Sequence, residues 1–156
     1  MPSYTLAAVF LAGAMTVIAQ HKPDFSGEWK LNLQASTLSP LVAPVAQSGV
    51  LRIEHREPKF TAHQTIVLDG KPFESNFELL SDGREVVANA GGRRIGSTLL
   101  WDGDALVFTS RIEGSGVQMT ISFRYDLQDG GHRLRAAEQV RGTDHDQDNI
   151  WMFDRR

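Results

Sequence analysis

The sequence predicts an all-β protein that folds as an antiparallel up-and-down β-barrel of about 8–10 strands. Apolar and polar residues alternate with a period of two along most of the chain after Gly49, which is typical of strands with one buried face. Short turn signals rich in Gly, Asp and Pro separate these runs, and no helical pattern lies between them. A meander of this length curls, and closing it removes the exposed strand edges.

The predicted strands follow one another from residue 27 to residue 155. The first covers 27–33, and the clearest alternation lies in 117–127, where Ile121 and Phe123 flank a polar Ser122. Asp69-Gly70 is a strong two-residue hairpin signal because both residues tolerate a positive φ. The other predicted strands are 51–56, 60–68, 73–79, 86–90, 95–101, 106–111, 134–140 and 149–155. A two-sheet sandwich is the structural alternative, but it typically needs a longer crossing connection than those seen after Gly49.

One long connection, residues 34–48, separates the first two predicted strands. It contains Pro40, Pro44 and several apolar residues. We expect a surface loop packed on its own side chains, and a lid over a barrel mouth is the alternative.

The composition is that of one globular domain. The 156 residues are 41% hydrophobic and 22% charged, which is ordinary for a chain with a single core. The net charge is −3, and the 16 basic residues are spread along the chain rather than clustered. This pattern predicts no nucleic-acid partner, since phosphate contacts require grouped Lys and Arg.

The N-terminus carries the pattern of a secretory leader. Residues 6–19 are apolar, too few to span a bilayer, and end in small residues that a signal peptidase reads. We predict a signal peptide over 1–19, cleavage after Ala19 and a barrel domain over 20–156; a buried N-terminal helix is the alternative. The chain has no cysteine to carry a lipid anchor. We therefore expect a secreted or periplasmic protein that does not attach to the membrane after cleavage.

The sequence offers little evidence for catalysis or for a metal. It has no cysteine and no Gly-x-Ser-x-Gly nucleophile motif, and its five histidines lack zinc-binding spacing. Residues 144–148 place three Asp at alternate positions as in an EF-hand loop, but Asn149 stands where Gly is expected and Arg155 where the closing acid belongs. We predict no catalytic residue, no metal and no cofactor, and leave enzymatic activity open.

Residues 24–32, Asp-Phe-Ser-Gly-Glu-Trp-Lys-Leu-Asn, resemble the first strand of the calycin barrels, the lipocalins and fatty-acid-binding proteins. Residues 101–107 are similar to a late hairpin of bacterial members of that group. The resemblance implies that Gly27 and Trp29 close one end of the barrel, with Trp29 packed against an arginine near the C-terminus. Arg155 is the best match and Arg141 the second. The capping helix pair and the arginine-centred carboxylate clamp of fatty-acid-binding proteins have no evident counterpart.

The predicted function follows from the barrel interior. About ten strands with small inward residues would leave a cavity for a small hydrophobic or amphipathic ligand. A core filled by aromatic side chains, each worth about 1.5–3 kcal/mol when buried, is the alternative. That alternative corresponds to a structural or interaction barrel without a ligand. The candidate ligand-binding residues of the interior are His55, Phe60, Gln64, Phe73, Ser75, Phe77, Met119, Phe123, Tyr125 and Glu138.

Two of these residues could support a different chemistry. An enzyme using the same cavity would need an acid or base such as His55 or Glu138 facing open space. A buried Glu138 would also need a hydrogen-bond partner or a raised pKa.

The hairpin at Trp101 is apolar on both faces because Leu100, Leu106 and Phe108 accompany the tryptophan. It predicts either a covered strand pair or an association surface, with a homodimer through this hairpin as the possible assembly.

Overall fold

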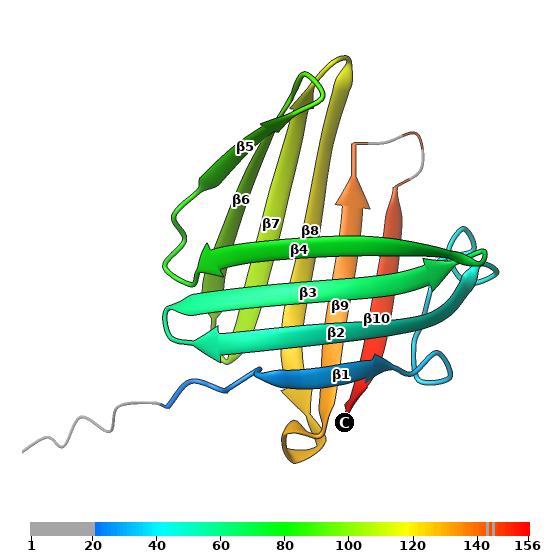
Figure 1. Cartoon of the computed structure of the whole chain (residues 1–156), viewed down its shortest axis with the longest axis vertical. Coiled ribbons are helices and arrows are strands. Elements are labelled where there is room, and N and C mark those ends of the chain that lie inside the picture. The colour runs from blue at the N-terminus through cyan, green and yellow to red at the C-terminus, as the bar shows by residue number, and fades with distance from the viewer. Residues whose placement is uncertain (1–20, 143, 145) are drawn as a thin grey trace, which may run out of the picture.

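A computed structural model describes residues 21–142, 144 and 146–156 of the chain (Figure 1). The predicted signal peptide lies outside the described residues. The described chain forms ten strands and one short 3-10 turn, η1 (Asp129–Gly131). The strands are β1 (Gly27–Leu31), β2 (Ala46–Arg56), β3 (Lys59–Leu68), β4 (Lys71–Leu80), β5 (Val86–Ala90), β6 (Arg93–Asp102), β7 (Ala105–Gly114), β8 (Val117–Gln128), β9 (Arg133–Arg141) and β10 (Gln147–Arg155).

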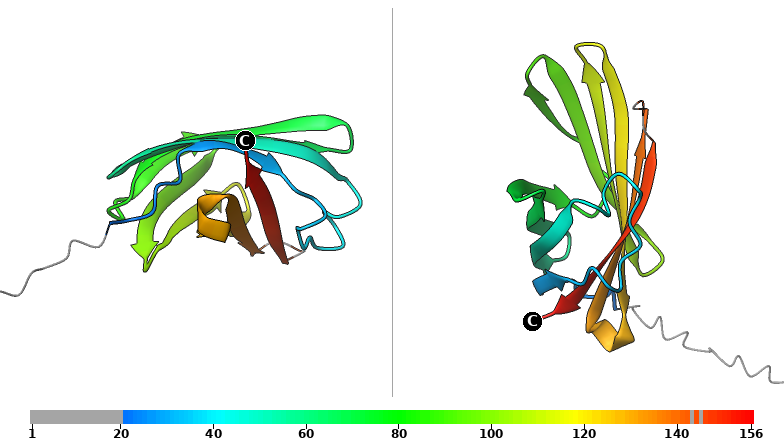
Figure 2. Two further views of the ribbon diagram at one scale, coloured as in Figure 1. Left: turned by 90° about the horizontal axis from the view of Figure 1, so that it is seen from below. Right: turned by 90° about the vertical axis from the view of Figure 1, so that its right-hand side faces the viewer.

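All ten strands belong to one antiparallel sheet with the order β4-β3-β2-β1-β10-β9-β8-β7-β6-β5. Strand β1 joins the two halves of the sheet, because Trp29 lies opposite Leu51 of β2 and opposite Arg155 of β10. In Figure 1 strands β1–β4 cross in front of β6–β10, and Figure 2 shows how the sheet curls between these layers. This continuous sheet confirms the up-and-down barrel and contradicts the sandwich alternative.

The barrel is nearly closed, with β4 and β5 as the two edge strands. These two strands do not pair with each other. The connection between them instead contacts β6. The Gly83 N–H donates to the Leu99 carbonyl at 2.9 Å, and Asp82 forms an isolated bridge with Leu100. Strands β4 and β6 therefore approach each other at one end, and the edges separate beyond it.

The turns form where the sequence predicts them. Asp69 and Gly70 adopt φ values of 48° and 72°, the left-handed backbone that a two-residue hairpin between β3 and β4 requires. The alternation on each side then fixes which side chains point inward.

The core lies between the two layers at the end of the barrel where β1 crosses β10. Its largest fully buried side chains include Phe25, Trp29, Phe60 and Phe153. Trp29 lies under the guanidinium of Arg155, as the resemblance to calycins implies.

The long connection between β1 and β2 packs on the core and on β10. Leu38 and Val42 contact the core cluster, while Thr37 pairs with Ile150 and the Ser39 N–H donates to Asn149 Oδ1 at 2.7 Å. Its turns contain no helix pair, and β2 begins at Ala46, earlier than the alternation indicates. Nowhere in the described ranges is a helix long and apolar enough to cross a membrane.

The Trp101 hairpin is largely a covered strand pair. Leu106 is fully buried, and Trp101 and Phe108 pack against the core cluster. Only Leu100 of the four apolar side chains is strongly exposed, at 53%. The homodimer through this hairpin stays a prediction.

Candidate ligand cavity

A partly open cavity of about 390 Å³ lies between β3 and β4 on one side and β6–β9 on the other. This volume falls within the range of small-molecule sites. Its apolar lining consists of Phe77, Phe108, Ile121 and Phe123. Its polar lining consists of Gln64, Ser75, Asn76, Ser97, Ser110, Tyr125 and Glu138. The cavity is therefore amphipathic, with apolar walls and a limited number of hydrogen-bonding groups.

Glu138 is the one charged residue of this lining among the described residues. It lies on β9 opposite Phe123 of β8 and opposite Asn149 of β10. Its Oε2 accepts hydrogen bonds from Trp151 Nε1 at 2.8 Å and from Asn149 Nδ2 at 2.9 Å. These two donors stabilise a carboxylate that would otherwise be costly to bury.

The other polar groups of the cavity are neutral. Ser97 and Ser110 lie opposite each other on β6 and β7, and their hydroxyl oxygens are 3.2 Å apart. Burial, with the nearby negative charge of Glu138, raises the pKa of Tyr125 far above its ordinary value. Its phenol therefore stays protonated at all physiological pH values and can donate or accept a hydrogen bond.

Aromatic side chains fill the part of the interior next to the cavity. Phe60 and Phe77 stack with ring centroids 5.9 Å apart, Phe77 and Phe108 at 4.7 Å, and Phe123 and Tyr125 at 5.8 Å. Such offset contacts fix the rings against one another. The interior is thus partly packed and partly hollow, which combines the two alternatives for the barrel core.

Six of the ten predicted ligand-binding residues line the cavity: Gln64, Ser75, Phe77, Phe123, Tyr125 and Glu138. The other four share the inward alternation but lie elsewhere. Phe60 is fully buried and stacks on Phe77 of the lining, and Phe73, near the far end of β4, is 56% exposed. Met119 lines a surface depression near the tips of β8 and β9, together with Arg141.

Sequence reasoning did not select five of the lining residues: Asn76, Ser97, Phe108, Ser110 and Ile121. Four of them alternate in step with the chosen residues, so the same period of two could have found them. Asn76 lies on the opposite parity, where it bonds His63 at 2.9 Å, and no sequence signal indicates its position.

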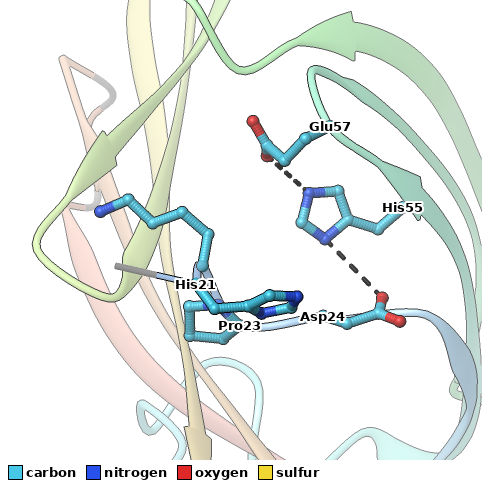
Figure 3. Close-up of a pocket in the computed structure, with 6 residues that line it drawn as sticks. His21, Pro23, Asp24, His55 and Glu57 are labelled. Atoms are coloured by element: carbon cyan, nitrogen blue, oxygen red, sulfur yellow. Dashed lines mark hydrogen bonds and ion pairs between the residues drawn. The ribbon is translucent and has the colours of Figure 1, made fainter. Parts of the chain in front are cut away.

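His55 lines a second pocket, at the surface, instead of the barrel cavity (Figure 3). This pocket has a similar volume, about 390 Å³, and is bounded by residues 21–24, His55 and Glu57. The His55 side chain is only 3% exposed. Its Nε2 lies 2.7 Å from Glu57 Oε1, and its Nδ1 accepts the Phe25 N–H at 3.3 Å.

Both ring nitrogens of His55 are thus engaged by the protein. Nε2 carries the proton shared with Glu57, and the lone pair of Nδ1 is directed at the backbone of Phe25. In this arrangement the imidazole has no free nitrogen with which to remove a proton from a substrate. The geometry favours a role in attaching the segment before β1 to β2.

Glu57 connects this histidine to the neighbouring turn and hairpin. Besides His55, it accepts hydrogen bonds from Ser81 Oγ at 2.8 Å and from Trp101 Nε1 at 3.0 Å. Burial acts against ionisation, but these hydrogen bonds outweigh it and hold the pKa of Glu57 below its ordinary 4.5.

The acidic segment before β10 forms internal contacts in the part of the chain that the structure describes. Asp148 pairs with Arg141 at 2.6 Å, and Asp146 accepts the Gly142 N–H at 3.1 Å. No three His, Cys, Asp or Glu side chains of the described residues are arranged to hold a metal ion.

The comparisons with known proteins find this barrel by structure and not by sequence. No protein-family profile and no curated protein sequence matches the chain. A secretory abundant heat soluble protein of Ramazzottius varieornatus superposes with a TM-score of 0.55 at 13% identity, over 84% of this chain and 94% of its own.

Two further solved structures carry ligands named with them. A zebrafish ileal bile-acid-binding protein complexed with cholic acid gives a TM-score of 0.55 at 13% identity, over 85% of this chain and 98% of its own. A Schistosoma mansoni fatty-acid-binding protein in complex with arachidonic acid gives a TM-score of 0.54 at 16% identity, over 85% of this chain and 96% of its own. Likenesses at this identity establish the fold alone: the chain has a calycin-like β-barrel fold.

Proposed function

We propose that this protein binds a small hydrophobic or amphipathic molecule inside its barrel. The cavity of about 390 Å³, with its apolar walls and few polar groups, is the observation that carries the proposal. The bile-acid-binding neighbour is complexed with cholic acid and the fatty-acid-binding neighbour with arachidonic acid, and both share this fold, which supports the proposal. The binding energy would come from removing apolar surface from water in a preformed site.

The polar groups of the cavity would orient the ligand. Tyr125, Ser97 and Ser110 offer neutral hydrogen-bonding groups on β6–β8, and Glu138 offers a charged acceptor on β9. Because a few positioned polar groups fix orientation at modest desolvation cost, this set suits one polar head on an apolar body.

We also propose that the protein acts outside the cytoplasm, as a secreted or periplasmic carrier. The support is the leader-like pattern of residues 1–19, with its apolar run and small terminal residues. N-terminal sequencing of protein from the producing cell tests this, and a chain beginning at Met1 in the exported fraction would contradict cleavage.

Binding inside the barrel is tested with N-phenyl-1-naphthylamine, a neutral apolar dye whose fluorescence rises on transfer from water. We expect saturable binding by the wild type and at least a tenfold weaker affinity for Ser97→Phe, because the new ring occupies the cavity. Thr98→Phe places the same ring on the outer face of β6 and serves as the matched control.

The outcomes distinguish a ligand-binding barrel from a structural one. Equal binding by both variants would place the dye outside the cavity. No binding by the wild type, together with no small molecule recovered by native mass spectrometry from several hosts, would favour the structural alternative.

A further inference from the structure

We infer that the barrel cavity selects amphiphiles with a cationic head, such as long-chain primary ammonium compounds, and discriminates against carboxylates. This inference rests on the proposed function and names the class of ligand. It follows from the charge of the cavity lining and from how Glu138 is held there.

The charge in the cavity is not balanced by the residues that line it. Glu138 is a carboxylate, and the described lining contains no Lys or Arg to neutralise it. The partners that the structure gives its side chain are the neutral Trp151 and Asn149. The cavity therefore holds a net negative charge, and the low dielectric around a bound ligand strengthens its effect.

The Glu138 carboxylate is held through one of its two oxygens. Both protein donors reach Oε2, at 2.8 and 2.9 Å. Both donors belong to β10, which pairs with β9 on the side opposite β8, and they hold the Glu138 side chain from that side. Within the described residues, Oε1 receives no protein hydrogen bond, and Glu138 lines the cavity. A carboxylate oxygen without a protein donor is best satisfied by a charged donor on the ligand.

Neighbouring residues of the lining suit a cation beside that carboxylate. Tyr125 lines the same cavity, and its phenol oxygen can accept a second hydrogen of an ammonium group. Phe123, opposite Glu138, offers an aromatic ring to the adjoining methylenes or to the cation itself. An anionic head at the same place would face Glu138 without a compensating positive charge.

The size of the cavity sets the length of the probe. At roughly 30 Å³ per group, the share of one water in the liquid, about 390 Å³ holds on the order of a dozen methylene-sized groups. Decylamine, decanol and decanoic acid therefore form a matched series with one chain and three heads. At pH 7.5 they carry a positive, a neutral and a negative head.

The experiment measures the affinity of the full-length barrel for each probe by displacement of N-phenyl-1-naphthylamine at pH 7.5. We expect decylamine to bind at least tenfold more tightly than decanoic acid, with decanol between them. In Glu138→Gln, which keeps the size and an acceptor oxygen, this preference should fall to less than threefold.

A matched control separates the cavity from the outer surface. Glu78→Gln removes the same charge from an exposed side chain of β4 that pairs with Lys59, and it should leave the preference intact. Circular dichroism checks that each variant is folded.

Each outcome has one meaning. Equal or tighter binding of decanoic acid overturns the cationic selectivity but leaves ligand binding established. A preference that survives Glu138→Gln overturns the assignment to this residue. If decanol also fails to displace the dye, the proposed function itself is wrong.

Discussion

The guanidinium of Arg155 lies over the indole of Trp29, with its Cζ 4.2 Å from the ring centroid. The two residues face each other across the β1–β10 pair that joins the halves of the sheet. Arg155 also donates from Nε to the Gly131 carbonyl at 2.8 Å and from Nη1 to the Ser26 carbonyl at 2.5 Å. One side chain thus ties the last strand to the β8–β9 turn and to the start of β1.

The first prediction concerns the planar shape of Arg155. Arg155→Lys should lower the free energy of unfolding by about 1–2 kcal/mol, because an ammonium cannot stack on Trp29 and reach both carbonyls. Urea denaturation measures the loss. Arg156→Lys, next in the chain and paired with Glu28 at the surface, should change it by less than about 0.5 kcal/mol. Equal effects of the two changes would contradict the role given to Arg155.

The second prediction concerns Gly27, which makes room for this arginine. Its φ is 141°, and a Cβ there would lie 2.7 Å from Arg155 Nη1. Gly27→Ala should destabilise the barrel by about 1–3 kcal/mol through backbone strain and this contact. Gly103→Ala, at φ 62° with open space around an added Cβ, measures the cost of an ordinary left-handed backbone without a contact.

A double-mutant cycle separates the two causes at Gly27. In the Arg155→Lys background the contact with Nη1 is gone, so Gly27→Ala should cost less than in the wild type. Full additivity in urea denaturation would show that backbone strain accounts for the whole effect.

The strands of this barrel could be predicted because local signals determine them. Asp69-Gly70 forces a hairpin wherever the neighbouring runs lie, and the alternation in 117–127 gives one buried face. The pairing of β1 with β10 follows once the meander closes. The absence of pairing between β4 and β5 could not be predicted, because the alternation and turn signals of both strands are the same as those of strands that do pair.

The cavity could be predicted only in part, because a period of two gives the face of a strand and not the depth along it. Phe73 shares the inward parity of Ser75 and Phe77 but lies near an exposed end of β4. His55 likewise has inward parity, yet Phe25, from outside the regular strands, covers it. Depth depends on how the sheet coils, which is set by contacts distant in sequence.

The third prediction is a pH dependence that arises from Glu57. Its pKa in the folded protein lies below the ordinary 4.5, so the unfolded chain binds protons more readily. The stabilisation is fully present above pH 4.5 and is lost as the pH falls through the lower, folded-state pKa. The difference in unfolding free energy between the wild type and Glu57→Gln should therefore be largest near neutrality and shrink below pH 4.5.

Urea denaturation at a series of pH values between 3 and 7 checks this prediction, with about half a unit between points as the useful spacing. Glu54→Gln, at an exposed position on β2 three residues earlier, is the control and should show no such trend. If the difference in unfolding free energy between the wild type and Glu57→Gln grows as the pH falls, the hydrogen bonds to Glu57 do not stabilise its ionised form and the prediction is wrong.

The last prediction concerns Asn149, which connects the cavity to the long β1–β2 connection. Its Oδ1 accepts the Ser39 N–H at 2.7 Å, its Nδ2 donates to Glu138 Oε2 at 2.9 Å, and the residue is 2% exposed. Asn149→Asp keeps the shape but replaces the donor with an oxygen, which brings two carboxylates together in a buried place. We expect a loss of about 2–4 kcal/mol at pH 7.

The sign of the accompanying pH dependence is opposite to that of Glu57. Repulsion from Glu138 and burial raise the pKa of the introduced carboxyl in the folded state, so the folded state binds the proton more tightly. The penalty is therefore complete above that raised pKa and disappears as the pH falls toward the unfolded value. Asn89→Asp, on exposed β5, should show neither effect. A penalty for Asn149→Asp that stays constant from pH 7 to pH 4 would mean that its amide does not face the Glu138 carboxylate.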